Sequence, residues 1–158
     1  MISISHLYNI VEEDRKKLFS FFQKIDEKHF YFSPKDNIWS SELIFRHLLM
    51  NIKWMLDKLP GEQIEGSNLA IDLDEDITNK HSLQDIIKEF NKFSPILDER
   101  LSSLSDEDEE KTIEMWKGKM QLRIYLTRLI NHEHRHLGQI QWLLKRSTGW
   151  TDKEIYGE

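Results

Sequence analysis

The chain has no cysteine among its 158 residues, which excludes disulfides, thiolate metal sites and a cysteine nucleophile of its own. It has only three prolines and six glycines, too few for an all-β chain of short strands and turns. The 22 basic residues are outnumbered by 28 acidic ones, so the chain lacks the basic excess of a dedicated nucleic-acid binder. We therefore expect no nucleic-acid partner.

Long apolar runs are also missing. No stretch approaches the ~18 uncharged apolar residues that a membrane span needs, so we expect no contact with a membrane. The N-terminal residues 1–22 are interrupted by charges at 12–17 and lack the basic start and cleavage site of a signal peptide. These absences predict a cytoplasmic protein. The length fits one domain, which we expect to cover residues 1–158.

Hydrophobic residues recur at three- and four-residue steps, which predicts amphipathic helices. Four such segments cover about residues 5–28, 40–59, 82–104 and 120–147. Ser40 or Ser41 caps the second segment, and Pro60 with Gly61 ends it. We expect Pro95 to kink or split the third segment, with Ser94 as a possible new cap.

The connections between these segments differ in length. Residues 62–81 have little periodicity and predict a long crossover, whereas residues 31–37 predict a turn. We expect residues 105–111 to form an acidic surface loop, followed by a short irregular piece around Trp116. Four long helices with one long crossover predict an all-α four-helix bundle.

Three histidines stand inside apolar stripes. With about 100° per residue, His132 and His136 fall within the apolar cluster of the last segment, and His134 falls on the opposite side. His47 shares an apolar face of the second segment. Imidazoles one turn apart can bind one ion, so we predict that His47, His132 and His136 converge on a metal. The alternative is three core histidines, each hydrogen-bonded separately.

Such a site has a definite chemistry. Neutral imidazole suits zinc, nickel, copper and iron, so the ligands do not identify the metal. Three protein ligands leave a position for water or substrate, as in catalytic zinc sites. Each ligand should donate its other ring nitrogen to an acceptor. The candidates for that acceptor are Glu133, Gln139, Asn51 and Asp14. For Asp14 the alternative is a salt bridge at the rim of the bundle.

Residues 132–136 also spell His-Glu-x-x-His, the motif that gives zinc peptidases two ligands and a general base. Glu133 is therefore the candidate catalytic residue. The extended form of the motif is absent, because Gln139 and Trp142 occupy the positions of its glycine and third histidine. The sequence also shows no alternating strands of a peptidase sheet. We keep a zinc peptidase only as a lesser alternative.

Two motifs resemble the DinB-like (DinB/YfiT-like) superfamily of metal-binding bundles. The first is residues 39–48, a tryptophan-serine turn with a histidine eight residues on, and the second is residues 132–140, a His-x-x-x-His followed by Gly-Gln. The small Gly138 of the second motif fits a close approach between helices. Family members often have a histidine directly before the second ligand, where this chain has Arg135.

The resemblance implies a four-helix bundle whose His47, His132 and His136 bind a divalent ion, here zinc, nickel, iron or manganese. It also implies a homodimer and a small-molecule substrate, in some members together with a low-molecular-weight thiol. Functions vary in the superfamily, and the resemblance does not assign a role to His134 or Glu154.

Two functions follow from these predictions. In the first, the protein is an enzyme, a thiol transferase or hydrolase in which the metal activates an external thiol or a water. Trp39, Trp54 and Tyr125 either line its pocket or belong to the core. In the second, the protein is a non-enzymatic metal-binding or stress-response module stabilised by the ion.

Overall fold

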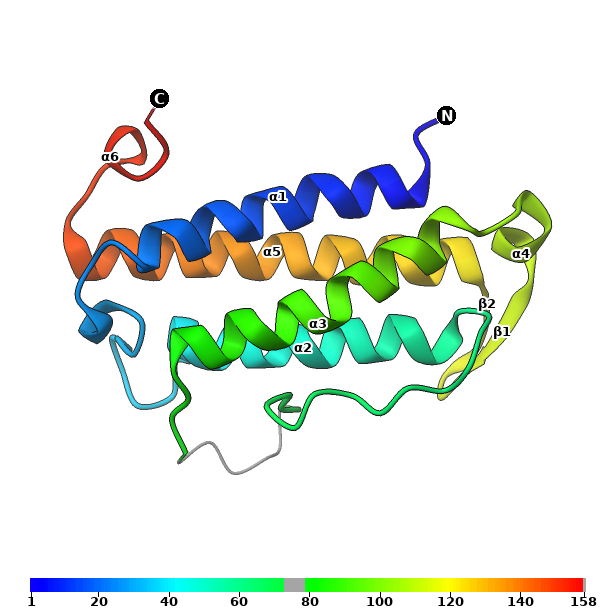
Figure 1. The fold of residues 1–158 in the computed structure, drawn as a ribbon, viewed down its shortest axis with the longest axis horizontal. Helices are drawn as coiled ribbons and strands as arrows, with labels where there is room; N and C mark the ends of the chain where they lie inside the picture. Colours follow the sequence, from blue (N-terminus) through cyan, green and yellow to red (C-terminus); the bar gives the residue numbers. More distant parts are fainter. Residues whose placement is uncertain (73–78, 158) are drawn as a thin grey trace.

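Four long helices form the body of the molecule (Figure 1). The computed structural model describes residues 1–72 and 79–157. The helices are α1 (Ile4–Phe22), α2 (Ser41–Lys58), α3 (Leu83–Ser102) and α5 (Leu122–Thr148). Helices α1 and α2 each pack on both α3 and α5, and α2 runs in the same direction as α3. Parallel neighbours need a long return of the chain between them, so the predicted bundle with a crossover is confirmed. Residues 73–78 of the predicted crossover lie outside the described residues.

The helix ends follow the caps that the sequence offers. Ser40 caps α2, since its Oγ accepts a hydrogen bond from the backbone N–H of Leu43 at 3.3 Å. Ser82 caps α3 in the same way, and Gly149 ends α5 with a left-handed φ of 73°. Helix α1 ends at Phe22, earlier than predicted, and a separate 3-10 turn, η1 (Glu27–His29), follows it.

Of the two predicted outcomes at Pro95, the split is wrong, because α3 continues through this residue as one helix. Pro95 and Asn91, whose carbonyl loses its helical partner, are both exposed, so water can satisfy that carbonyl. The neighbouring Phe93 and Leu97 are buried and hold the helix against the bundle. Ser94 is not a cap. Its hydroxyl is buried and accepts hydrogen bonds from α1 instead.

The stretch between α3 and α5 is more ordered than predicted. The expected acidic loop contains a short helix, α4 (Asp106–Glu110), whose capping box joins Ser105 and Asp108. The expected irregular piece is an antiparallel hairpin of β1 (Thr112–Met115) and β2 (Gly118–Gln121). Gly118 allows the tight connection, because its φ of 120° is disfavoured for other residues.

The chain after α5 turns into a short helix, α6 (Asp152–Tyr156), which the sequence reading did not anticipate. Glu154 forms a capping box with Thr151, so the observed contacts of Glu154 are local to this helix. Among the described residues, every helix is too short or too polar to cross a bilayer.

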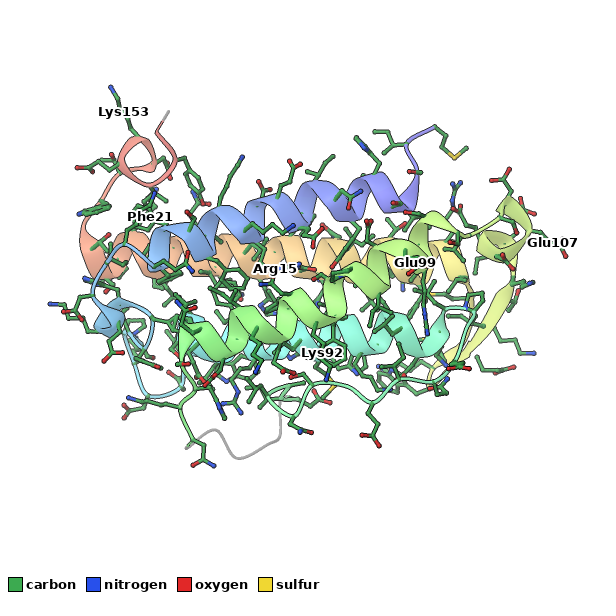
Figure 2. All side chains as sticks on the ribbon, viewed as in Figure 1. Arg15, Phe21, Lys92, Glu99, Glu107 and Lys153 are labelled. Carbon is green, nitrogen blue, oxygen red and sulfur yellow. The ribbon has the colours of Figure 1, made fainter. Side chains whose placement is uncertain are left out.

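Gly138 does not serve a close contact between helices. A β-carbon placed at Gly138 would meet no atom within 4 Å, so the expectation of a close helix approach there is wrong. Buried apolar side chains fill the space between α1, α2, α3 and α5 (Figure 2), and some charged residues are buried among them. Arg15 lies among them with 1% of its surface exposed.

Candidate metal centre

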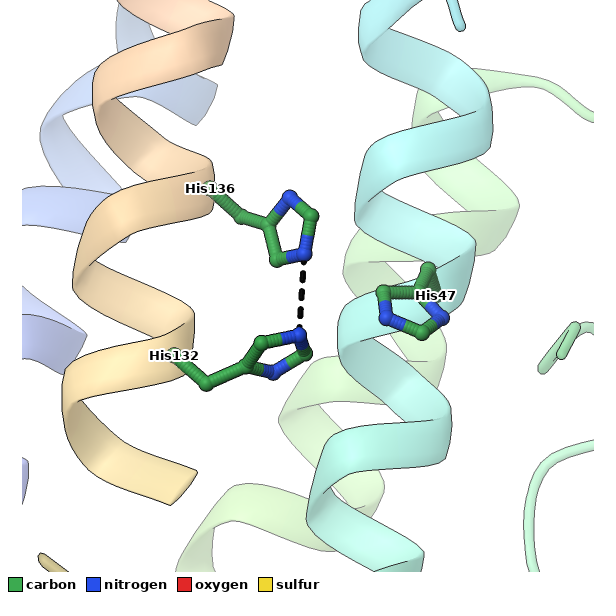
Figure 3. Close-up of side chains that lie close together, drawn as sticks. All are labelled: His47, His132 and His136. Atoms are coloured by element: carbon green, nitrogen blue, oxygen red, sulfur yellow. Dashed lines mark hydrogen bonds between the residues drawn. The ribbon is translucent and has the colours of Figure 1, made fainter. Parts of the chain in front are cut away.

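The three predicted histidines lie together between two helices (Figure 3). His47 comes from α2, while His132 and His136 come from successive turns of α5. The Nε2 atoms of His132 and His136 are 3.0 Å apart, and one ring nitrogen of each of the three residues lies within 4.8 Å of the others. His134 is exposed and takes no part in this cluster, as its helical position predicts. We call the three residues the histidine triad.

The other ring nitrogens of the α5 histidines contact amide oxygens. His132 Nδ1 lies 3.1 Å from Oδ1 of Asn51, whose amide nitrogen donates to the carbonyl of Leu129 at 3.0 Å. His136 Nδ1 lies 2.7 Å from Oε1 of Gln139. Both amides were expected as acceptors for these nitrogens. With Nδ1 donating to an oxygen, each Nε2 carries a lone pair instead of a proton.

The remaining histidine is oriented by the crossover. His47 Nδ1 lies 3.3 Å from the backbone carbonyl of Ile71, so this Nδ1 also donates. The guanidinium of Arg46 holds the crossover on α2 at two places, donating to the carbonyls of Leu69 at 2.8 Å and Asn79 at 2.9 Å. The sequence reading missed Ile71, because a backbone carbonyl can belong to any residue type.

The nitrogens of the triad suit a cation. Two lone pairs face each other between His132 and His136 at 3.0 Å, an arrangement that is repulsive without a positive charge between them. Two nitrogens bound to one zinc ion at about 2.0–2.1 Å stand about 3.3 Å apart in tetrahedral geometry, close to this separation. The triad could therefore hold a metal ion, and its donors do not identify which one.

The surroundings of the triad lower the pKa of its histidines, which favours binding of a cation. Burial lowers the pKa of His47 and of His136 below the ordinary value for histidine. For His132, burial together with the neighbouring His136, His47 and Arg135 lowers the pKa to about 4. All three imidazoles are thus neutral near pH 7, the form that binds metals.

Two indoles stand beside the triad. The rings of Trp39 and Trp54 lie 5.4 Å and 5.6 Å from the ring of His47, both edge-on. Tyr125 is buried, and its hydroxyl donates to the carbonyl of Trp54 at 3.1 Å. Of the three aromatic residues considered from the sequence, two contact the triad and Tyr125 belongs to the core.

Glu133 faces away from the triad. Its carboxylate is fully buried and forms an ion pair with Arg15 of α1, whose Nη2 also donates to Ser94 at 2.8 Å. Glu133 is therefore an acceptor for Arg15 and for none of the imidazoles. The sequence reading missed Arg15, although its spacing from Val11 and Leu18 places it on the buried stripe of α1.

Asp14 does not contact the triad either. It is half-buried and lines a hollow on the α1–α5 side of the bundle together with His134 and Arg135. The sequence predicted that Asp14 lies on the buried stripe of this helix. The next residue, Arg15, is the buried one instead.

Comparisons with known proteins agree with this fold. The sequence model described as the DinB superfamily matches residues 10–140. A DinB-like protein of Bacillus cereus ATCC 10987 is 19% identical, with a TM-score of 0.65 over 92% of this chain and 93% of that one. A DinB-like protein of Bacillus subtilis is 18% identical, with a TM-score of 0.64 over the same shares. A comparison with the curated proteins gave no match.

Proposed function

The chain belongs to the DinB superfamily, and on that premise we propose that His47, His132 and His136 hold one divalent metal ion in a small-molecule enzyme. The observation that carries this proposal is the convergence of three neutral imidazoles whose Nδ1 atoms each contact an oxygen. The alternative is three core histidines that are hydrogen-bonded separately. In that case nothing would favour an arrangement in which their unprotonated nitrogens point toward one another.

The reaction would use a nucleophile from outside the chain. A divalent ion with an open position lowers the pKa of a bound thiol or water toward neutrality. The chain supplies no thiol, since it has no cysteine. Its own residues orient two of the imidazoles, through Asn51 and Gln139, and place the indoles of Trp39 and Trp54 beside His47.

The peptidase alternative finds no support in the position of Glu133. A general base must reach the water that it deprotonates, so it must lie beside the metal ligands. The Glu133 carboxylate instead bonds to Arg15 on the side of α5 that packs on α1. Using it as a base would require breaking a buried ion pair, which is costly.

A second candidate is the non-enzymatic metal-binding module. It is favoured by the placement of the triad across two helices, because an ion there would join α2 to α5. An ion bound only by the folded state raises its stability. Because both candidates bind metal, only a measurement of catalytic turnover distinguishes the module from the enzyme.

The test measures metal content in four variants. Full-length protein and the variants His47→Ala, His132→Ala, His136→Ala and His134→Ala are incubated with zinc, nickel, iron(II) or manganese, and bound metal is counted after desalting. We expect about one ion per chain in the wild type and in His134→Ala, and a loss in the three triad variants. No bound ion in the wild type, or an equal loss in His134→Ala, would contradict the proposal.

Activity is then measured on the loaded protein. Small thiols are offered with an epoxide, and esters and amides with water. Turnover that disappears in His47→Ala supports the enzyme, whereas binding with thermal stabilisation and no turnover supports the module. The external thiol, the small-molecule substrate and the homodimer stay predictions, and size-exclusion chromatography with light scattering measures the last.

A further inference from the structure

A hollow of about 470 Å³ opens beside the triad. Its walls are mostly apolar, formed by Ile38 and Trp39 before α2, by Ile44 of α2, and by Trp142 and Leu143 of α5. Its volume lies within the range of about 300–1,000 Å³ that is usual for small-ligand sites. The hollow is therefore large enough for one ring-sized molecule.

The hollow is continuous with the triad. His136 is one of its lining residues, so one imidazole belongs to both. Trp39 also belongs to both, because its indole lines the hollow and lies 5.4 Å from the ring of His47. A molecule in the hollow thus sits against the edge of the triad.

No charged side chain lines this hollow among the described residues. By contrast, the larger hollow on the α1–α5 side is lined by Asp14, Lys17, Arg135 and Asp152. A carboxylate or an ammonium group in the hollow beside the triad would lose water without gaining an opposite charge, which is unfavourable. The chemistry of the walls therefore selects uncharged groups.

Two features of the walls favour an aromatic ring. Trp142 has 51% of its surface exposed and Ile38 has 36%, so both leave apolar surface in water that a flat ring would cover. Among the described lining residues, the polar groups besides the two indole N–H groups are the amides of Asn37 and Gln139 and the imidazole of His136. Since Oε1 of Gln139 contacts His136, its amide nitrogen is the part that can donate to a ligand oxygen.

From these observations we propose that the hollow binds the non-reacting part of the substrate, an uncharged aromatic ring carrying an oxygen acceptor. The proposal rests on the proposed function, because it places this ring beside the site where the reaction would occur. It narrows the substrate to small neutral aryl compounds. A multiply charged thiol would find no counter-charge in the hollow, so the hollow serves the other reactant.

The test uses three matched probes of one size: 4-fluorobenzyl alcohol, 4-fluorobenzoate and 4-fluorobenzylamine. Each is titrated into the full-length, metal-free protein and followed by fluorine NMR. We expect saturable binding of the neutral alcohol only. We expect Trp142→Ala to weaken that binding about tenfold or more, because it removes one wall. The matched control is Trp116→Ala on the β1–β2 hairpin, where the indole is 84% exposed, and it should bind like the wild type.

Equal binding of the charged probes, no saturable binding by the wild type, or unchanged binding by Trp142→Ala would each overturn the proposal. A change of oligomeric state in Trp142→Ala, with no probe binding by the wild type, would overturn it and assign this face to a second copy. Circular dichroism checks that both variants fold. Because the probes need no metal, failure here is separate from failure of the proposed function, which the metal content reports.

Discussion

Asn51 accepts a hydrogen bond from Nδ1 of His132 at 3.1 Å while its own amide nitrogen donates to the carbonyl of Leu129. The second bond fixes which end of the amide faces the imidazole. Asn51 therefore determines the tautomer of His132, and it does so from α2, the helix that also carries His47. One buried amide thus links the two helices that form the triad.

Replacing this amide should weaken metal binding without removing a ligand. We expect Asn51→Ala to lower the affinity for zinc by about 10- to 100-fold, the usual effect of losing the partner of a ligating histidine. Competition with a chromophoric chelator measures the affinity. Asn131→Ala, at an exposed position of α5, is the control and should leave the affinity unchanged. Equal affinities in all three proteins would show that Asn51 does not orient the ligand.

Acid should destabilise the metal-free protein. The pKa of His132 is about 4 in the folded state, mainly because of burial, against an ordinary value of 6.5. Between these values the unfolded chain binds a proton that the folded one does not, so stability is full above 6.5 and falls as the pH drops toward 4. Urea denaturation at about pH 7.5 and about pH 5 measures the loss. His132→Gln should show a smaller loss, and an unchanged loss would contradict the assignment.

Replacing only one member of the Arg15–Glu133 ion pair should lower the stability of the fold more than replacing both. Arg15→Met leaves a buried carboxylate without its partner and should destabilise the fold by about 3–5 kcal/mol. The double variant Arg15→Met with Glu133→Leu removes both charges and should recover much of that stability. Urea denaturation gives both values.

The control for this pair lies one position along α1. Lys16 pairs with Glu12 at 3.6 Å but is 62% exposed. Lys16→Met should therefore change stability by less than about 0.5 kcal/mol. A double variant as unstable as Arg15→Met alone would mean that lost packing, and not the unpaired charge, dominates.

Two glycines should respond oppositely to alanine. Gly138 lies inside α5 with free space around it, so Gly138→Ala should stabilise the protein by about 0.5–1 kcal/mol. Gly149 has a φ of 73°, so Gly149→Ala should destabilise it by about 1–2 kcal/mol. Thermal unfolding of the two variants compares them directly. Destabilisation by Gly138→Ala would show that the glycine serves a contact in an assembly of chains.

The sequence predicted the features that repeat along a helix. The apolar spacing located all four long helices, and the caps at Ser40 and Gly149 set the ends of α2 and α5 closely. The same spacing placed His132 and His136 on one face and His134 on the other. These features depend on near neighbours in the chain, which a single sequence contains.

The features that the sequence did not reveal depend on distant partners or on very short elements. The β1–β2 hairpin pairs only four residues on each side, too few to show an alternating pattern. Pro95 suggested a break that packing of the neighbouring side chains prevents. The carbonyl of Ile71 contacts His47 because of the way the crossover folds. Every residue has a backbone carbonyl, so the residue type at position 71 does not predict this contact.

His132 and Glu133 are consecutive residues of α5, and they engage different neighbours, α2 through Asn51 and α1 through Arg15. Rotating α5 about its axis would disturb both contacts at once. Two consecutive residues therefore fix the rotation of α5 about its own axis, one against each neighbouring helix. We therefore expect substitutions on the α1 side to shift the triad on the opposite side without replacing an imidazole. Laboratory selection for a different metal preference should recover changes around Arg15 as well as around the histidines.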